Sequence, residues 1–243
     1  MIFSPPPRNL RAELLDLDEA PYEEVKDSLN DVRRVNRYLS GYRVLLFRAA
    51  EFLRKRPEGG GPLTILDVAT GSADQPMALV RRARQLGIPV RIVAIDINYK
   101  MLQFATECAR RFPEIDLVQC DILALPFKEG SFDLVVNSLS LHHFSWENAV
   151  AILRNMYRVC RRGIIVNDLH RSRVAHASIF LLTRLLTKNR LTRYDAPVSV
   201  MNAFTPSEIG RLAREAGIED YEVHRHFPYR IALVGKKSHS IQE

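Results

Sequence analysis

The sequence contains no apolar run that approaches the roughly 18 to 20 residues of a membrane-spanning helix. Its start, Met1 to Pro7, lacks the basic segment and apolar core of a secretory signal peptide, so none is expected. There are only 3 cysteines, and their spacing is not typical of metal ligands, so no metal site is expected. An odd number of cysteines without an export signal predicts reduced thiols and a cytoplasmic protein.

Positive charge is in moderate excess, since 35 lysines and arginines face 28 aspartates and glutamates, for a formal net charge of +7. A nucleic acid or an anionic membrane surface could be the partner. Alternatively, the arginines cover solvated helix faces. The second interpretation is favoured because several arginines fall in segments with a helical pattern, namely Arg81, Arg82, Arg84, Arg110 and Arg111. Nucleic acid is therefore not the expected partner, although charge alone does not decide the question.

The 243 residues suffice for one large α/β domain or for a domain with a helical cap. The first 20 residues begin with a Pro-rich segment that is expected to be mobile. Over residues 22–56 apolar positions recur every three or four residues, as on helices, with a break at Gly41. Residues 54–62, rich in Gly and Pro, are typical of a linker. The sequence thus predicts a helical cap and linker over residues 1–61 and a core over 62–243.

In the core, short apolar runs alternate with helical patterns. Strands are predicted at 63–68, 90–95, 115–119, 132–137 and 163–167, and helices at 76–86, 100–112 and 146–160. Strands that are nearly all apolar and alternate with helices indicate a parallel sheet covered on both faces. The expected fold is therefore a doubly wound α/β sheet.

Two later segments depart from this alternation. A strongly apolar helix is predicted at 175–186, within a helical insertion at about 172–203. Near the end, runs at 221–226 and 229–234 are separated only by Phe227 and Pro228, too few residues for a crossover helix. These two strands should be antiparallel. The complete prediction is a mostly parallel, seven-stranded sheet that ends in an antiparallel hairpin.

The first predicted strand ends in a turn of small residues from Asp67 to Asp74. Ligands of open α/β sheets bind outside the carboxyl ends of the strands, where the strand order reverses. Small residues at 69, 71 and 73 allow a ligand to approach the backbone closely, and the amides at the start of the next helix can receive a carboxylate. A tight turn that binds nothing is the alternative.

Two further aspartates follow the next strands. Asp96 ends the second strand, at the distance from the turn where a carboxylate suits a ribose diol, and Asp121 directly follows the third strand. Either could instead cap a helix. With Asp67, however, they form a row along one edge of the sheet, which capping alone does not explain well.

With these residues the sequence resembles the class I S-adenosylmethionine-dependent methyltransferases over about residues 63–234. The run 121–133 is similar to the small-molecule branch that includes the ubiquinone and menaquinone methyltransferases. The resemblance implies that the turn holds the methionine part of S-adenosylmethionine, Asp96 the ribose and Asp121 the adenine amino group. It also implies supporting roles for the following residues: Asp67, Ala69, Thr70, Gly71 and Ser72 in the turn, and Ile97 and Ile122 beside adenine.

The turn departs from the family pattern at two positions. The family usually has three glycines, whereas residues 69 and 73 are alanine here. We expect both alanines to permit close approach at φ below zero. The rival interpretation is a dehydrogenase, whose turn depends more strongly on these glycines. A dehydrogenase also explains neither Asp121 nor the closing hairpin.

The acceptor side follows the fourth and fifth strands. Asn137 and Ser138 should border the methionine part and the transferred methyl group, and the neighbouring His143 is a candidate base. Asp168 and His170, after the fifth strand, are candidates to act as a base or to orient a hydroxyl. Packing and helix capping are the alternative roles of the histidines.

The predicted function is methyl transfer to a small hydrophobic acceptor, a phenol, a quinone or a polyketide-like compound, at oxygen or carbon. The apolar helices at the N-terminus and at 175–186 should cover the acceptor pocket. The alternatives are an RNA or protein methyltransferase, suggested by the charge, and a non-catalytic cofactor-binding protein. Basic residues beside the apolar helix leave peripheral membrane contact open. The oligomeric state is not predicted.

Overall fold

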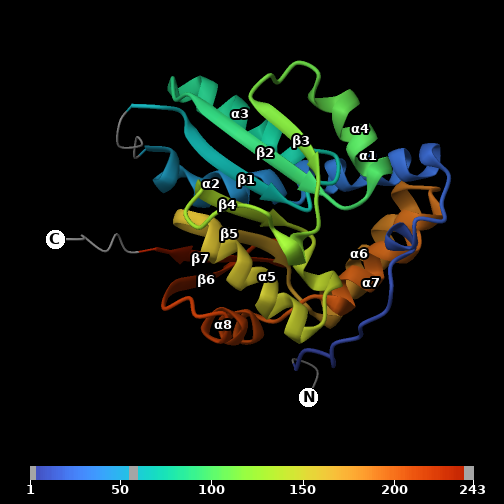
Figure 1. Ribbon diagram of the computed structural model, residues 1–243. Coiled ribbons are helices and arrows are strands. Elements are labelled where there is room, and N and C mark those ends of the chain that lie inside the picture. Colours follow the sequence, from blue (N-terminus) through green and yellow to red (C-terminus); the bar gives the residue numbers. More distant parts are fainter. Residues whose placement is uncertain (1–3, 55–59, 238–243) are drawn as a thin grey trace.

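A single seven-stranded sheet runs through the protein (Figure 1). The computed structural model describes residues 4–54 and 60–237. The strands are β1 (Leu63–Val68), β2 (Val90–Asp96), β3 (Ile115–Gln119), β4 (Phe132–Ser138), β5 (Cys160–Leu169), β6 (Asp220–His226) and β7 (Arg230–Lys236). Their order in the sheet is β3-β2-β1-β4-β5-β7-β6.

The pairing confirms the predicted fold. Strands β1 to β5 pair in parallel, and β7 lies antiparallel between β5 and β6. The strand order reverses between β1 and β4, so the carboxyl ends of these two strands border the crevice where ligands of such sheets bind. The turn after β1 therefore lies where the sequence predicted a ligand site.

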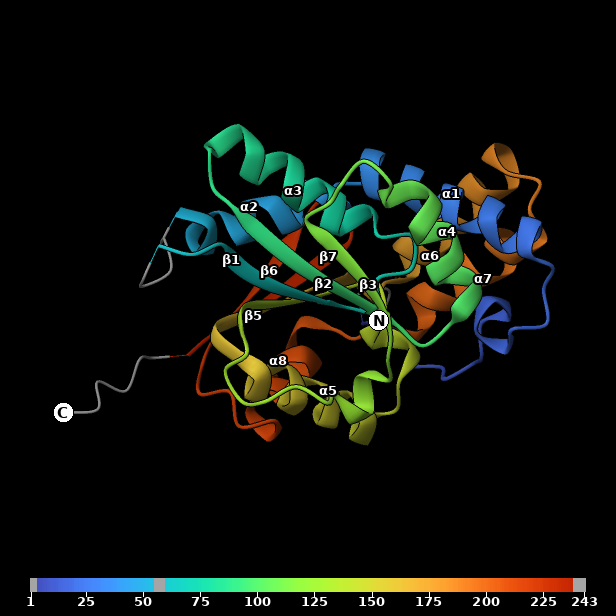
Figure 2. The ribbon, with the colours of Figure 1, turned by 45° about the horizontal axis from the view of Figure 1, so that its top comes forward.

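Helices cover both faces of the sheet, as Figure 2 shows. They are α1 (Tyr22–Tyr38), α2 (Gly41–Arg54), α3 (Asp74–Leu86), α4 (Tyr99–Ala109), α5 (Trp146–Val159), α6 (Arg173–Leu186), α7 (Arg190–Asn202) and α8 (Pro206–Glu215). Short 3₁₀ helices are η1 (Leu14–Leu17), η2 (Ile122–Ala124) and η3 (Leu141–His143). The buried apolar residues of α2 and α3 form one core against the sheet, and those of α5 and α8 form the core on the other face. Within the described residues, no helix is both long and apolar enough to cross a membrane.

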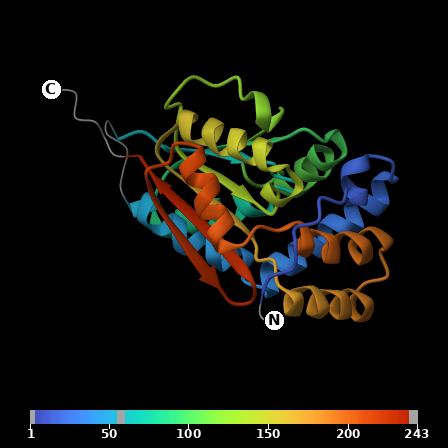
Figure 3. The ribbon, with the colours of Figure 1, turned by 90° about the horizontal axis from the view of Figure 1, so that it is seen from below.

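The insertion after β5 consists of two helices rather than one. Helix α6 packs on α7, and α7 packs on α1, η1 and η3, so that α6 is the outer helix (Figure 3). Only Ala175 and Thr183 of α6 are buried. The 3₁₀ helix η3, on which α7 packs, follows β4. That the apolar helix covers the acceptor pocket stays a prediction.

The N-terminal segment crosses the carboxyl edge of the sheet. We call residues 8–20 the strap. Arg8 donates to the carbonyl oxygens of His142 and Phe144 at 2.9 and 2.8 Å, and Asp18 forms an ion pair with Lys100 at 3.0 Å. These contacts hold the strap against the core. The expected mobility of the Pro-rich segment that precedes it stays a prediction. The boundary predicted at residue 61 stays a prediction, and most of the expected linker, residues 55–59, lies outside the described residues.

Candidate active site

The turn after β1 has an unusual backbone. Ala69, Gly71 and Ala73 have φ values of 58°, 55° and 55°, in the left-handed region. Glycine adopts this region freely, whereas an alanine there costs roughly 1–2 kcal/mol because its Cβ approaches a carbonyl oxygen. The expectation that the two alanines lie at φ below zero is therefore wrong. The turn keeps the backbone of a three-glycine turn with only one glycine.

The strain at Ala69 can be measured. We expect Ala69→Gly to raise the free energy of unfolding by about 1 kcal/mol, because glycine removes the Cβ contact and the partly exposed methyl group contributes little packing. Urea denaturation measures the change. The matched control is Ala78→Gly in the interior of α3, where glycine should lower the free energy of unfolding by about 1 kcal/mol. Similar losses in both variants would contradict the strain at Ala69.

Asp96 ties the turn to the neighbouring strand. Its Oδ2 accepts a hydrogen bond from the amide of Gly71 at 2.8 Å, and its Oδ1 accepts one from the amide of Asn98 at 3.0 Å. The carboxyl group is buried, and burial raises its pKa. Each oxygen retains a second lone pair, so that the group can still accept hydrogen bonds from a diol.

Polar atoms without a partner gather around this turn. Among the described residues, the buried atoms Asp67 Oδ2, Thr70 Oγ1, Asn137 Oδ1, Ser138 Oγ and both amide atoms of Gln75 make no hydrogen bond. Such atoms are uncommon because each costs free energy when it is buried unpaired. Burial also raises the pKa of Asp67 to about 8, and the nearby Asp74 and Asp96 act in the same direction. These groups fit a ligand with several hydrogen-bonding atoms, as the methionine part of S-adenosylmethionine has.

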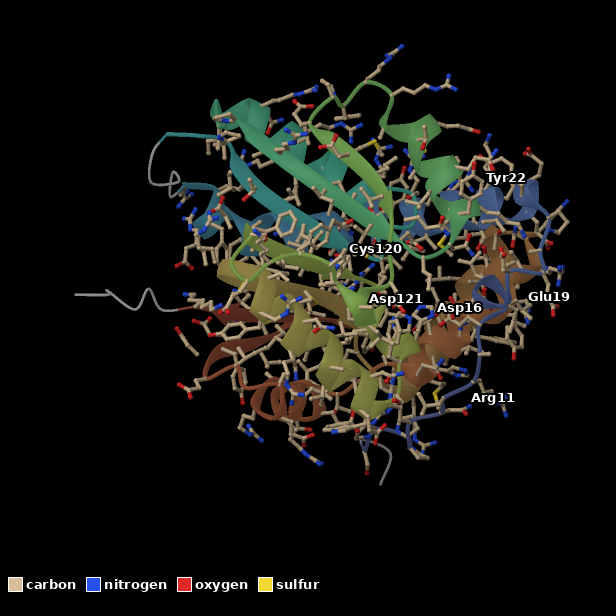
Figure 4. All side chains as sticks on the ribbon, in the orientation of Figure 1. Arg11, Asp16, Glu19, Tyr22, Cys120 and Asp121 are labelled. Atoms are coloured by element: carbon tan, nitrogen blue, oxygen red, sulfur yellow. The ribbon has the colours of Figure 1, made fainter. Side chains whose placement is uncertain are left out.

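The end of β3 lies next to the end of β2. Asp96 is in register with Gln119, which places Asp121 at the same edge (Figure 4). Oδ1 of Asp121 caps η2 through the amide of Leu123, and the residue is otherwise exposed. Ile97, directly after Asp96, is 64% exposed, whereas Ile122, directly after Asp121, is buried in the core. An exposed apolar side chain next to a carboxylate suits a planar base.

The opposite end of the crevice holds histidines and carboxylates in alternation. Nδ1 of the buried His142 lies 2.6 Å from Oδ1 of Asp168, and its Nε2 lies 3.5 Å from Oε1 of Glu13 in the strap. On the other side of Glu13, Nε2 of His143 is 3.9 Å from Oε2, and its Nδ1 is 2.6 Å from Asp16. We call these five residues the imidazole–carboxylate cluster.

Electrostatics in the cluster favour charged groups. Burial alone would lower the pKa of His142, but Asp168 and Glu13 raise it to about 10. Burial likewise works against ionised Asp168 and Glu13, yet the histidines lower both pKa values. The cluster therefore holds an imidazolium between two carboxylates. An acceptor oxygen that takes the place of Glu13 at Nε2 can accept a hydrogen bond from this imidazolium and exchange a proton with it.

The structure brings some of the predicted catalytic residues together. Asp168 and His143 belong to the cluster, whereas within the described part of the chain no side-chain hydrogen bond or ion pair joins His170 to it. The backbone amide of His170 donates to Tyr229, and burial with nearby Arg225 lowers the pKa of its side chain. The sequence analysis missed His142 as the partner of Asp168, although both residues follow adjacent strands. It also missed Glu13, for which no sequence pattern gives a signal.

The charge of His142 should be visible in the pH dependence of stability. Its pKa is about 10 in the folded protein and about 6.5 in an unfolded chain. The folded protein keeps the proton that the unfolded chain releases, so the stabilisation is complete below pH 6.5 and lost as the pH rises through 10.

We therefore expect the free energy of unfolding of the wild type to fall more steeply between pH 7 and pH 9.5 than that of His142→Gln. The difference in slope should reach at most about 1.4 kcal/mol per pH unit. Urea denaturation at a series of pH values measures both curves. Parallel curves would show that His142 does not hold the extra proton.

In sequence, part of the chain is similar to known methyltransferases. Residues 65–163 match a family model described as a methyltransferase domain. The ubiquinone/menaquinone biosynthesis C-methyltransferase UbiE of Enterobacter sp. (strain 638) is 33% identical over 103 residues, 41% of this chain and 39% of that protein. The demethylmenaquinone methyltransferase of Porphyromonas gingivalis is 31% identical over 115 residues, 46% of this chain and 45% of that protein. The chain thus spans less than half the length of these relatives.

Two solved structures share the fold over most of the chain. A SAM-dependent methyltransferase from Aquifex aeolicus has a TM-score of 0.61 at 18% identity, over 90% of this chain and 99% of that one. Human N-acetylserotonin methyltransferase in complex with SAM has a TM-score of 0.65 at 17% identity, over 90% of this chain and 57% of that one. The matched domain contains the turn, Asp96, Asp121 and both cluster histidines. Residues 65–163 thus match a methyltransferase domain in sequence, and most of the chain shares the fold of solved S-adenosylmethionine-dependent methyltransferases.

Proposed function

We propose that the protein transfers the methyl group of S-adenosylmethionine to a small hydrophobic acceptor with an acidic hydroxyl or enol. The observation that carries this proposal is the arrangement along one edge of the sheet. Unpaired buried polar atoms surround the turn after β1, and the imidazole–carboxylate cluster begins at the end of the adjacent strand β4. A binding site and a proton-exchanging group thus flank the point where the strand order reverses.

On the cofactor side, each residue has a role that its geometry supports. Ala69, Thr70, Gly71 and Ser72 form the turn that admits the methionine part, and Asp67 supports the turn from below. Asn137 and Ser138 border the same part from β4, with Asn137 fixed by its donation to the carbonyl oxygen of Val68 at 3.0 Å. Asp96 holds the ribose and Asp121 the adenine amino group. Ile97 packs on the adenine ring, and the backbone of Ile122 contacts it. Bound S-adenosylmethionine supplies an electrophilic methyl group.

On the acceptor side, the chain aligns the acceptor and manages its proton. His142, oriented by Asp168 and Glu13, is the group that faces an acceptor oxygen and stabilises its negative charge. His143 and His170 stay proposals as further bases. Alignment of the two reactants and exclusion of water supply much of the catalysis of such a displacement.

The hydrophobic character of the acceptor rests on the helices above the crevice. The side chain of Leu29 in α1 lies 3.8 Å from the position that a Cβ would take at Gly71, so α1 covers the turn. Leu29 belongs to an apolar cluster with Val25 and Leu191, which joins α1 to α7. A phenol, quinone or polyketide-like ring suits this environment. The two curated relatives act, by their names, in ubiquinone or menaquinone biosynthesis or on demethylmenaquinone.

The experiment is methyl transfer from cofactor labelled in its methyl group. We expect label in at least one member of a panel of phenols, quinols and β-diketones, with the product identified by mass spectrometry. Absence of turnover across the panel, with retained binding of S-adenosylhomocysteine, would favour the non-catalytic alternative. Label in RNA or protein, together with binding that weakens steeply with salt, would favour a macromolecular substrate.

As part of this proposal, the protein contacts the surface of an anionic membrane through helix α6. Its outer face exposes Val174, Phe180, Leu181, Leu182, Leu185 and Leu186. Beside it, a recess of about 670 Å³ is lined by four arginines, Arg11, Arg184, Arg190 and Arg193. Apolar side chains next to clustered arginines suit a surface of anionic lipids, from which a hydrophobic acceptor could be drawn.

We expect the protein to sediment with phosphatidylglycerol vesicles and much less with phosphatidylcholine vesicles. The double variant Leu185→Glu with Leu186→Glu should reduce the bound fraction several-fold, since it places two charges where two apolar side chains meet the lipid. The control is Leu86→Glu, at the exposed end of α3. Equal binding of the wild type and the double variant would contradict contact through α6.

A further inference from the structure

Arg230 is a buried cation at the carboxyl edge of the sheet. It begins β7, its residue is 1% exposed, and in the sheet it lies opposite Leu169 at the end of β5. Its Nη2 donates to Oδ1 of Asn36 at 3.0 Å, and its Nη1 has no partner. Among the described residues, no carboxylate lies within ion-pair distance of its guanidinium. A fully buried guanidinium that lacks a direct counter-charge is expensive to maintain.

A chain of hydrogen bonds leads from Arg230 to the turn after β1. Asn36, in α1, accepts from Arg230 and donates to Oδ2 of Asp74 at 2.8 Å. Asp74 opens α3, and its Oδ1 accepts from the hydroxyl of Ser72 at 3.2 Å. The guanidinium is therefore held in a fixed position relative to the turn.

Other unpaired polar atoms lie on the same face of the sheet. Asn167 and Ser138 are paired in register on β5 and β4, and Asn167 is opposite Ala232, two residues after Arg230. Side chains two residues apart on a strand share a face. The Nδ2 of Asn167 donates to Gly41, but its Oδ1 and the hydroxyl of Ser138 have no partner. On this face of the sheet, the cationic Nη1 of Arg230, the amide oxygen of Asn167 and the hydroxyl of Ser138 thus all lack a hydrogen-bond partner.

We propose that Arg230, with Asn167 and Ser138, binds a carboxylate that carries a neighbouring N–H or O–H donor. The carboxylate pairs with the free Nη1 of Arg230, and the donor group of the ligand pairs with Oδ1 of Asn167. This inference rests on the proposed function, because two molecules in a methyl transfer can supply that chemistry. One is the amino acid end of the cofactor, and the other is a hydroxylated aromatic acid as the acceptor.

Calorimetry with two pairs of probes distinguishes the two sources. The first pair is S-adenosylhomocysteine and 5′-methylthioadenosine, which lacks the amino acid end. The second pair is 2,4-dihydroxybenzoate and resorcinol, which lacks the carboxylate. In Arg230→Gln we expect an affinity loss of about 10- to 100-fold for the carboxylate member of one pair, with its partner unchanged. The affected pair identifies the source.

Two further variants keep the test valid if Arg230→Gln does not fold. Asn167→Asp places a competing carboxylate beside the guanidinium and should weaken binding of the same carboxylate probe. Arg230→Lys should bind that probe more tightly than Arg230→Gln does. Thermal melting checks that each variant is folded. Equal losses for both members of each pair, or no loss for any probe, would overturn the proposal. Failure of the wild type to bind S-adenosylhomocysteine would contradict the proposed function instead, and the benzoate pair still tests Arg230 without cofactor.

Discussion

Replacing Asp96 by alanine should lower the affinity for S-adenosylhomocysteine by about 100-fold or more. The carboxylate holds the amides of Gly71 and Asn98, so its removal frees the strained turn as well as the hydrogen-bonding group for the ribose. Hydrogen bonds to a charged group are worth roughly 1.5–3 kcal/mol each, and two of them suffice for such a loss. Calorimetry with purified protein measures it directly.

The matched control is Asp116→Ala in β3. Asp116 is also a strand aspartate, but it is exposed and pairs with Arg91 at 3.0 Å, away from the turn. Its replacement should leave the affinity unchanged, because an exposed ion pair contributes little. If Asp96→Ala binds S-adenosylhomocysteine as tightly as the wild type does, the cofactor site has been assigned to the wrong carboxylate.

Replacing His142 by alanine should lower kcat by about 10²- to 10⁴-fold and leave the binding of S-adenosylhomocysteine within about two-fold. The loss is expected because His142, between Asp168 and Glu13, is the group that we propose meets the acceptor oxygen. Asp168→Asn should give a similar loss, since the amide no longer supports a positive charge on His142. Single-turnover rates with an active acceptor from the labelled panel separate this effect from binding.

Three histidine variants sharpen the assignment. His143→Ala should lose less than His142→Ala, because the close partner of His143 is the exposed Asp16 and its contact with the buried Glu13 is longer, at 3.9 Å. His224→Ala, on β6 and paired with Glu222, should be neutral. If His170→Ala instead shows the largest loss, proton exchange does not occur at the imidazole–carboxylate cluster.

The sheet could be predicted from the sequence because each of its inner strands is a nearly continuous apolar run. The predicted and observed bounds of β1 and β3 agree, and the short Phe227–Pro228 connection required antiparallel strands. Helix α8 was missed, although Thr205 and Glu208 form a capping box that is visible in the sequence. Helix α7 was not recognised as separate from α6. Its polar and apolar residues do not follow a clear helical period, and Pro197 lies inside it, where a helix is not expected to continue.

The cofactor side was more predictable than the acceptor side, for a physical reason. The turn, Asp96 and Asp121 follow consecutive strands, so their proximity follows from the strand order alone. The contact of Glu13 with His142 joins residues that lie far apart in the chain, and neither local periodicity nor strand order predicts it. The left-handed alanines were also unpredictable, because the surrounding fold overrides the backbone preference of alanine.

The strap also lies where the acceptor would enter and the product would leave. His142 is 2% exposed beneath Glu13, so no acceptor reaches it until the strap shifts. The strap is held mainly by polar contacts such as those of Arg8 and Asp18, which exchange with water far more readily than a packed apolar core opens. If His142 meets the acceptor as proposed, opening of the strap is part of every turnover. Where that step is slower than methyl transfer, kcat reports the departure of product rather than the chemistry.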